Sequence, residues 1–244
     1  MYRKRHAEKT VRKLETMFGA ILVAGPRQVG KTTMLKEMTQ KFLYVTLDDL
    51  ILRGNAQEES GTFFKDNPPP IFIDEIQKAP QLFPYIKMYI DENHEKGQFF
   101  MSGSQQFQMM RGVSESLSGR IGLLTLLGYS LREISNNRFD LPFLPDDGYF
   151  SARKACLPSF DYDAIWNTIH RGSLPELQEN PDFDWQMFYS AYVSTYIERD
   201  VRDLTEVGDT IKFARFMTAA AASTGKLLNL ASLARDVISQ IIHL

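Results

Sequence analysis

The segment from Gly25 to Thr32 (Gly-Pro-Arg-Gln-Val-Gly-Lys-Thr) contains the residue types needed to hold phosphate groups. Gly25 and Gly30 permit backbone angles that turn successive N–H groups toward one point. The ammonium group of Lys31 would contact the β- and γ-phosphates, and the Thr32 hydroxyl would bind Mg²⁺. The segment therefore predicts a nucleotide-binding loop in which Lys31 has a catalytic role. The predicted nucleotide contacts are Gly25, Pro26, Arg27, Gln28, Val29, Gly30, Lys31, Thr32 and Thr33.

A pair of carboxylates, Asp74 and Glu75, follows the apolar run Ile71-Phe72-Ile73. An unbroken apolar run is typical of a central strand in a parallel sheet, where both faces are buried. At the carboxyl end of such a strand, Asp74 would hold the Mg²⁺ ion. Glu75 would accept a proton from an attacking water. The alternative is that both carboxylates cap the start of a helix.

Two serines follow the apolar run at 99–101. A hydroxyl at the end of this strand would lie between the carboxylates and the γ-phosphate. Ser104 is therefore a candidate catalytic residue, with Ser102 as the other choice. The alternative is that Ser102-Gly103-Ser104 is a plain turn.

Arg120 precedes a further candidate strand at residues 121–127. An arginine here would either complete a neighbouring subunit's active site, by stabilising transition-state charge, or form a local ion pair. Both interpretations stay open, and Arg111 is a weaker candidate for the catalytic one. In the second half, Arg199 or Arg202 would contact the nucleotide or belong to a solvated helix face with paired charges.

The elements that must position these groups alternate between apolar runs and amphipathic segments from residue 20 to about 127. The run Ala20–Ala24 precedes the glycine loop, and Pro80–His94 predicts an amphipathic helix. This alternation predicts an α/β fold with three layers, α/β/α, around a parallel sheet. Such sheets bind their ligands at the carboxyl ends of the strands, where these motifs lie.

Two flanking segments are assigned local roles. Residues Tyr2–Phe18 predict a basic helix with a solvated charged face, the alternative being a patch that binds phosphate or nucleic acid. Residues Phe42–Leu47 predict a short strand that ends at Asp48 and Asp49. These two carboxylates would cap the next helix or contact a ligand.

The second half predicts a smaller, mainly helical region. Residues 136–160 contain several prolines and lack periodicity, which predicts a linker or irregular insertion between the core at 1–135 and the rest. Residues 161–225 predict a helical region, with strong helices at Trp185–Leu204 and Ile211–Ala222.

Composition narrows the choice of function. The 244 residues carry a formal net charge of −2, which gives no global attraction to a polyanion. The single cysteine, Cys156, excludes an intramolecular disulfide framework and a cysteine-rich zinc site. No apolar stretch approaches the roughly 20 residues that span a bilayer, and the N-terminus lacks the apolar part of a signal peptide. We therefore expect a cytoplasmic protein with no membrane association.

Four stretches together resemble the prokaryotic AAA+ superfamily ATPases, in the branch with an appended C-terminal domain of unknown function. They are Gly25–Thr33, Phe72–Pro80 (Phe-Ile-Asp-Glu-Ile-Gln-Lys-Ala-Pro), the Ser-Gly-Ser, Leu-Ser-Gly-Arg and Leu-Arg-Glu segments within Ser102–Glu133, and Tyr192–Leu204. The resemblance covers roughly residues 10 to 238.

The resemblance implies a P-loop ATPase core that binds and hydrolyses Mg·ATP. By position, the Walker A motif of the family falls on Gly25–Thr32 and its Walker B pair on Asp74 and Glu75. The polar sensor residue falls on Ser104 or Ser102.

Residues 226–244 resemble an incomplete winged helix. Asn229–Val237 is similar to the first helix of a helix-turn-helix, but no glycine turn and no second basic helix follow. Since the recognition helix of such a motif enters the DNA groove, DNA binding is not expected of this chain. The departure leads us to expect a C-terminally truncated family member.

Three functions fit the sequence. The first is an Mg²⁺-dependent ATPase whose cycle acts as a conformational switch. The second is a nucleotide-binding regulatory or interaction module with little or no turnover. The third is a nucleotide-kinase type of phosphotransferase, against which the Asp-Glu pair argues because it suits water as acceptor. A homo-oligomer and a protein partner both stay open.

Overall fold

The computed structural model describes residues 2–104, 116–137, 139, 141–157, 161–196 and 210–242. The chain divides into two compact units, Met1–Pro181 and Asp182–Leu244. Each unit is described by itself.

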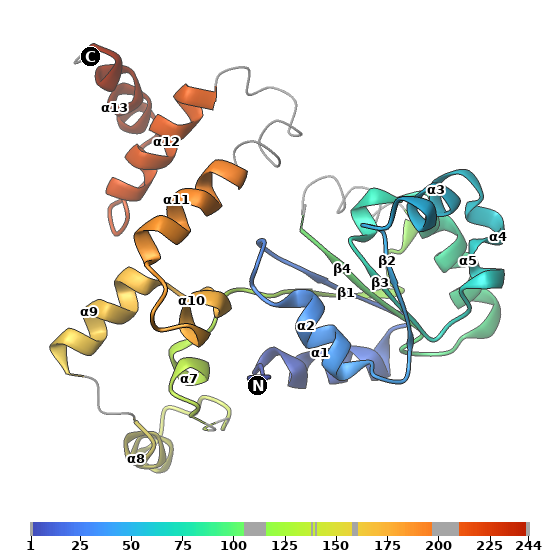
Figure 1. Cartoon of the computed structure of the whole chain (residues 1–244). Coiled ribbons are helices and arrows are strands. Elements are labelled where there is room, and N and C mark those ends of the chain that lie inside the picture. The colour runs from blue at the N-terminus through green and yellow to red at the C-terminus, as the bar shows by residue number, and fades with distance from the viewer. Residues whose placement is uncertain are drawn as a thin grey trace. The chain divides into compact units, whose positions relative to one another are not determined.

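The first unit is built on a sheet of five parallel strands in the order β2-β3-β4-β1-β5. This arrangement confirms the predicted α/β fold (Figure 1). Because β1 lies between β4 and β5, the loop after β1 leaves the sheet near the carboxyl ends of β3 and β4. The strands are β1 (Ala20–Ala24), β2 (Leu43–Thr46), β3 (Ile71–Asp74), β4 (Phe99–Gly103) and β5 (Ile121–Thr125).

Helices cover both faces of the sheet. Helices α1 and α2 pack on one face, against β1, β5, β3 and β4, and α4 and α5 pack on the other. Helix α3 lies against β2 and α4, and the short 3-10 helix η1 connects β3 to α5. The bounds are α1 (Ala7–Met17), α2 (Lys31–Met38), α3 (Leu50–Glu58), α4 (Ser60–Asp66), η1 (Ile76–Lys78) and α5 (Leu82–Asn93).

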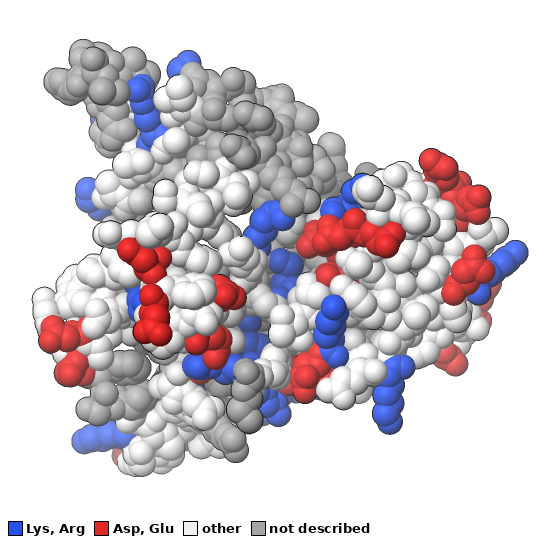
Figure 2. Space-filling model, viewed as in Figure 1, with Lys and Arg blue, Asp and Glu red and all other residues white. Residues whose placement is uncertain are grey.

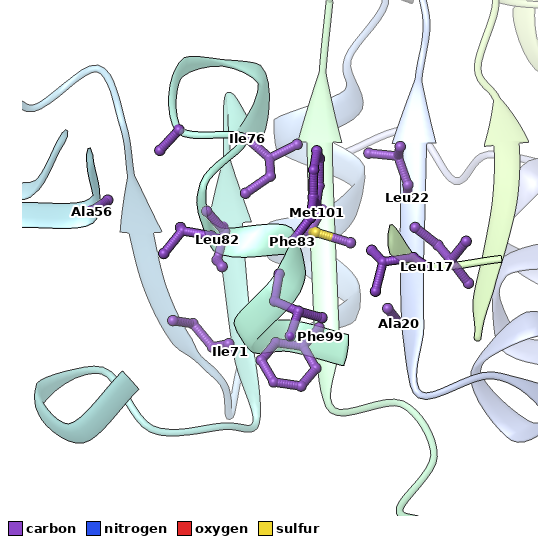
Figure 3. Close-up of a cluster of buried hydrophobic side chains, with 14 of the residues drawn as sticks. Ala20, Leu22, Ala56, Ile71, Ile76, Leu82, Phe83, Phe99, Met101 and Leu117 are labelled. Atoms are coloured by element: carbon purple, nitrogen blue, oxygen red, sulfur yellow. The ribbon is translucent and has the colours of Figure 1, made fainter. Parts of the chain in front are cut away.

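The main core lies between the sheet and α5, and its strand residues alternate as the two-residue period of a strand requires (Figure 3). Phe99 is fully buried there and meets the rings of Phe64 and Tyr89 edge-on, at centroid distances of 5.5 and 5.3 Å. The intervening residues, among them Phe72 and Phe100, are buried on the opposite face with α2. Burial on both faces explains the unbroken apolar runs of β1, β3 and β4.

The N-terminal segment departs from the prediction. A helix was expected over Tyr2–Phe18, but α1 begins at Ala7, and the residues before it are not helical. The reason is that contacts with other parts of the unit fix the conformation of the residues before α1. The backbone N–H of Arg5 donates to the Glu8 carboxylate at 2.7 Å, and the Arg5 side chain reaches other parts of the unit.

The rest of the first unit contains four helices in its described part. They are α7 (Leu131–Ile134), α8 (Asp147–Ala155), α9 (Tyr162–Arg171) and α10 (Pro175–Glu179). The stretch at 136–160 was predicted to be irregular, yet α8 lies within it. Asp146 caps that helix by accepting a hydrogen bond from the Tyr149 N–H at 2.6 Å.

The described part of the second unit is mainly helical. It contains α11 (Trp185–Tyr196), α12 (Thr210–Ala222) and α13 (Leu230–Ile242), and α12 packs against α13. Helix α12 matches the helix predicted at Ile211–Ala222. Arg199 and Arg202 lie outside the described residues, as does Arg111 of the first unit.

No helix in the described part of the chain is long and apolar enough to cross a membrane. Acidic and basic side chains are interspersed over the face shown in Figure 2. This distribution fits a chain with 28 basic and 30 acidic residues.

Replacing Phe99 by Ala should lower the free energy of unfolding by about 3–5 kcal/mol, because the truncated side chain leaves a cavity beneath Phe64 and Tyr89. Urea denaturation measures the change. Leu50→Ala is the control, since Leu50 is 70% exposed and its loss should cost less than about 1 kcal/mol. Equal losses in the two variants would contradict the assignment of this core.

Candidate nucleotide-binding site

The loop between β1 and α2 has the backbone geometry that the glycines predict. Gly25 has φ +149°, and a Cβ atom at this position would lie 2.1 Å from the Leu126 carbonyl oxygen, so only glycine fits. Gly30 has φ +87° and immediately precedes the first residue of α2. The loop therefore ends at a helix N-terminus, which favours an anion.

Lys31 lies across this loop. Its side chain is largely buried, and its ammonium group donates to the carbonyl oxygens of Gly25 at 3.0 Å and Pro26 at 2.7 Å. The positive charge is thus held beside the loop whose N–H groups were predicted to contact phosphate.

Asp74, at the carboxyl end of β3, is buried and accepts hydrogen bonds from three other elements. The Thr32 hydroxyl, from α2, donates to Asp74 Oδ1 at 2.9 Å, and Ser102, from β4, donates to the same oxygen. The Tyr44 hydroxyl, from β2, donates to Oδ2 at 3.2 Å. The structure thus brings together Thr32 and Asp74, the two predicted metal ligands.

Tyr44 was missed in the sequence, although it lies next to the pair. Its ring packs against Phe72 at 5.3 Å, and the Lys36 ammonium lies 3.8 Å from the ring centroid. Burial and the negative charge of Asp74 raise the pKa of the Tyr44 hydroxyl, which keeps it protonated as a donor. Its position two residues before the end of a strand was a partial signal, because polar groups near strand ends meet at this edge of a parallel sheet.

Glu75 follows Asp74 in the left-handed backbone conformation, with φ +59° and ψ +44°. Its carboxylate accepts hydrogen bonds from Gln77 and, at 3.4 Å, from the Ser104 hydroxyl. The Glu75 N–H donates to the Ser102 hydroxyl at 3.4 Å. The Glu75 side chain makes no capping hydrogen bond to η1, so its carboxylate does not serve as a helix cap.

The hydroxyl groups of the two candidate serines donate to different carboxylates. Ser102 is fully buried and bonds to Asp74, whereas Ser104 bonds to Glu75. Ser104 is therefore the serine next to the predicted general base.

Arg120 lies at the amino ends of the strands, whereas these groups lie at the carboxyl ends, because Arg120 precedes the parallel strand β5. It forms the local ion pair that the sequence left open. Its guanidinium donates to both carboxylate oxygens of Asp91 on α5, one of them at 3.0 Å, and to the Ser118 carbonyl at 3.1 Å. This pair lowers the pKa of Asp91 and raises the pKa of Arg120.

A buried ion pair between Arg5 and Glu133 lies next to the glycine loop and is hydrogen-bonded to it. Arg5, about 4% exposed, donates to Glu133 Oε1 at 3.0 Å and to the Val29 carbonyl oxygen at 2.7 Å. The same guanidinium donates to the carbonyl oxygens of Leu127 at 2.8 Å and Gly128 at 3.1 Å. One side chain thus joins the N-terminal segment, the glycine loop and the turn after β5.

Glu133 is held ionised. Burial raises the pKa of its carboxyl, but N–H groups of Ser130 and His6, at 2.7 and 2.8 Å, and the Arg5 charge lower it by more. The net pKa lies below the ordinary value of 4.5. Ser130 and Glu133 also form a capping box at the start of α7.

A cleft of about 170 Å³ opens beside the loop. Arg3 borders it and forms an ion pair with Glu179 of α10 at 2.8 Å. The cleft is lined by Tyr2, Arg3, Arg5, Gly30, Thr33, Tyr129, Pro175, Glu176 and Glu179.

Comparison with known families gives two matches. Residues 18–135 match the model of an AAA domain, and residues 162–241 match a domain of unknown function (DUF8612). Residues 18–135 thus form a domain of the AAA type, and an appended C-terminal domain follows it. The family suggests nucleotide binding and hydrolysis, and the first match contains the loop, Asp74, Glu75 and both serines.

Two curated relatives and one solved structure are similar to this chain. Uncharacterized proteins of Mycobacterium tuberculosis and Mycobacterium bovis are each 25% identical over 96% of this chain and 48% of their own length. The chain therefore spans about half the length of these curated relatives. A Walker-type ATPase of Pyrococcus abyssi has a similar fold, with a TM-score of 0.52, 11% identity and coverage of 97% of this chain and 89% of that one.

The depressed pKa of Glu133 predicts a pH dependence for the stability of this protein. A carboxyl whose pKa is lowered on folding contributes stability above its unfolded pKa and loses it as the pH falls through the folded pKa. The free energy of unfolding should therefore fall below about pH 4.5, and Glu133→Gln should flatten that part of the profile.

The same variant should cost about 3–5 kcal/mol at pH 7, because it leaves the buried Arg5 charge without its partner. Glu15→Gln is the matched control, since Glu15 pairs with Arg12 at the surface and should matter by less than about 1 kcal/mol. Denaturant titrations from pH 3 to 8 measure both. An unchanged profile in Glu133→Gln would contradict the role of the pair.

Proposed function

We propose that this AAA domain binds ATP with Mg²⁺, hydrolyses it and uses the cycle as a conformational switch. The observation that carries the proposal is the 2.9 Å contact between the Thr32 hydroxyl and the Asp74 carboxylate, directly after the glycine loop. A hydroxyl from the first turn of α2 and a carboxylate from a central strand end have no need to meet for packing. Their meeting suits a shared cation beside bound phosphate.

The residues present fit Mg²⁺. Both donors are oxygens, which Mg²⁺ prefers, and this ion commonly binds through one or two protein groups while its other ligands are water and phosphate oxygens. Within the described segments no cluster of three His, Cys, Asp or Glu side chains could hold a metal by itself. Thr32 and Asp74 would hold the ion, which neutralises phosphate charge when bound.

The loop and Lys31 would bind the β- and γ-phosphates. Lys31 now donates to two loop carbonyls, and phosphate oxygens would replace these acceptors. From the phosphates, the nucleoside would extend past Thr33 into the adjoining cleft, where Tyr2 and Tyr129 offer ring surfaces.

Glu75 would act as the general base. The water oxygen attacks the γ-phosphorus, the bond from that phosphorus to the bridging oxygen of ADP breaks, and a water proton passes to the Glu75 carboxylate. Ser104, hydrogen-bonded to Glu75, would contact the γ-phosphate and report its loss.

The switch would be transmitted through Val29. This loop residue is hydrogen-bonded to Arg5, which also bonds to the turn after β5. A change in loop conformation on phosphate release would therefore alter contacts of that turn and of Glu133.

One observation favours the alternative, a nucleotide-binding regulatory module with little turnover. The Glu75 carboxylate is engaged by Gln77 and Ser104. A carboxylate fixed by these two hydrogen bonds can deprotonate water only if its fixed position already faces the attacking water. Turnover measurements separate the two functions.

Glu75→Gln should retain ATP affinity within about two-fold and lower the rate of phosphate release by about 10²–10⁴-fold, because the amide accepts no proton. Lys31→Ala should lose nucleotide binding and turnover together. Titration with a fluorescent ATP analogue and a phosphate-release assay with and without Mg²⁺ measure these quantities. ATP binding without any Lys31-dependent phosphate release in the wild type would favour the regulatory module.

The role of Arg120 in a neighbouring subunit stays a prediction. If it acts in trans, turnover per chain should rise with protein concentration, and Arg120→Ala should remove that rise, with a loss of about 10³-fold at saturation. Asp91→Asn is the matched control, because it breaks the local pair and retains the arginine. Equal effects of the two substitutions would show that only the local pair matters.

A further inference from the structure

The short helix η1 places a glutamine beside the candidate base. Gln77 follows Glu75 by two residues, and its side-chain N–H group donates to Glu75 Oε2. The same nitrogen lies 3.3 Å from the Ser104 hydroxyl oxygen. Gln77, Glu75 and Ser104 thus form a closed triangle of polar contacts at the ends of β3 and β4.

The other atom of the Gln77 amide is unusual. Its carbonyl oxygen, Oε1, is buried and accepts no hydrogen bond from any residue that the structure describes. A buried amide oxygen without a donor destabilises the folded state, so such a group needs an explanation. Because the nitrogen of the same amide contacts Glu75, this acceptor lies close to the Glu75 carboxylate.

Gln77 is also held firmly from the outer side of η1. The next residue, Lys78, forms an ion pair with Asp48, which follows β2. The Lys78 carbonyl oxygen accepts a hydrogen bond from the Gln57 amide of α3 at 2.5 Å. Two contacts to neighbouring elements therefore fix the helix that carries Gln77, whose amide nitrogen contacts Glu75.

We propose that Gln77 is a positioning residue for hydrolysis: its N–H group fixes the Glu75 carboxylate, and its carbonyl oxygen accepts a hydrogen bond from the attacking water. This inference rests on the proposed ATPase function. A water that attacks phosphorus has two protons, of which one passes to Glu75. The second proton can be donated to an acceptor, and Gln77 Oε1 is a buried acceptor without a donor among the described residues.

No bond to Gln77 forms or breaks in this step. The water oxygen forms the new bond to the γ-phosphorus, ADP leaves with the bridging oxygen, and Glu75 receives the proton. Gln77 lowers the cost of orienting the base and the nucleophile, which is a contribution to the transition state and not to ATP binding.

Two substitutions at Gln77 test the proposal. Gln77→Glu keeps the shape, replaces the donor by an oxygen and adds a negative charge beside Glu75. Gln77→Met keeps the length and removes every polar atom. Both should lower kcat for phosphate release by about ten- to a hundredfold, with the Kd for ATP within about two-fold of wild type.

A binding measurement extends the test beyond activity. ADP with aluminium fluoride mimics the transferring phosphoryl group, and both variants should bind this combination more weakly by a factor similar to their loss in kcat. The affinity of both variants for ADP alone should not change, nor should the melting temperature of Gln77→Met, which adds no charge. Isothermal titration calorimetry and differential scanning fluorimetry measure these quantities.

Gln81→Glu is the matched control. Gln81 is exposed and makes no capping hydrogen bond at the start of α5, so the same exchange four residues later should leave kcat unchanged.

Wild-type kcat in Gln77→Met would overturn the inference and leave the ATPase function standing. Parallel losses of kcat, ATP affinity and melting temperature would also overturn it, because they indicate a structural role. A wild-type chain without Lys31-dependent phosphate release would overturn the proposed function and, with it, this inference.

Discussion

The buried carboxylate of Asp74 is the constraint on which the site depends. A negative charge taken out of water is costly unless hydrogen bonds compensate it, and at this position three hydroxyl groups do so. They come from α2, β2 and β4, so the carboxylate fixes the glycine loop relative to two strands. The arrangement is possible because parallel strands end at one edge, where polar groups from neighbouring strands meet.

The Arg5–Glu133 pair is a second buried charge system, on the other side of the loop. Replacing a buried ion pair by apolar groups is often neutral or stabilising, so stability alone does not account for this one. Its geometry offers another reason. The Arg5 guanidinium uses donors in several directions and orders carbonyl groups of Val29, Leu127 and Gly128, which a hydrophobic side chain would leave without partners.

The features that could be predicted from the sequence are those that depend on local residue patterns and on the geometry of a parallel sheet. The glycine loop, the Asp74–Glu75 pair and the parallel sheet follow from apolar runs that end in polar residues. Arg5 and Glu133 were not paired, because they lie 128 residues apart and no local rule joins them. Helix α8 was missed because flanking prolines obscured its Asp146 cap. The contact of Tyr44 with Asp74 depends on strand order, which one sequence does not reveal.

The buried charges of Asp74 and Arg5 contact two residues of the glycine loop that lie close together in the sequence. Thr32 bonds to Asp74 on one side, and Val29 bonds to Arg5 on the other, so only Gly30 and Lys31 separate the two anchors. A rotation of the loop that breaks one of these hydrogen bonds would therefore displace the backbone close to the other. Lys31, which contacts loop carbonyls and would contact phosphate, lies between them. A phosphate-dependent movement of Lys31 would thus be transmitted through Gly30 and Val29 to the Arg5 side chain, which contacts the turn after β5.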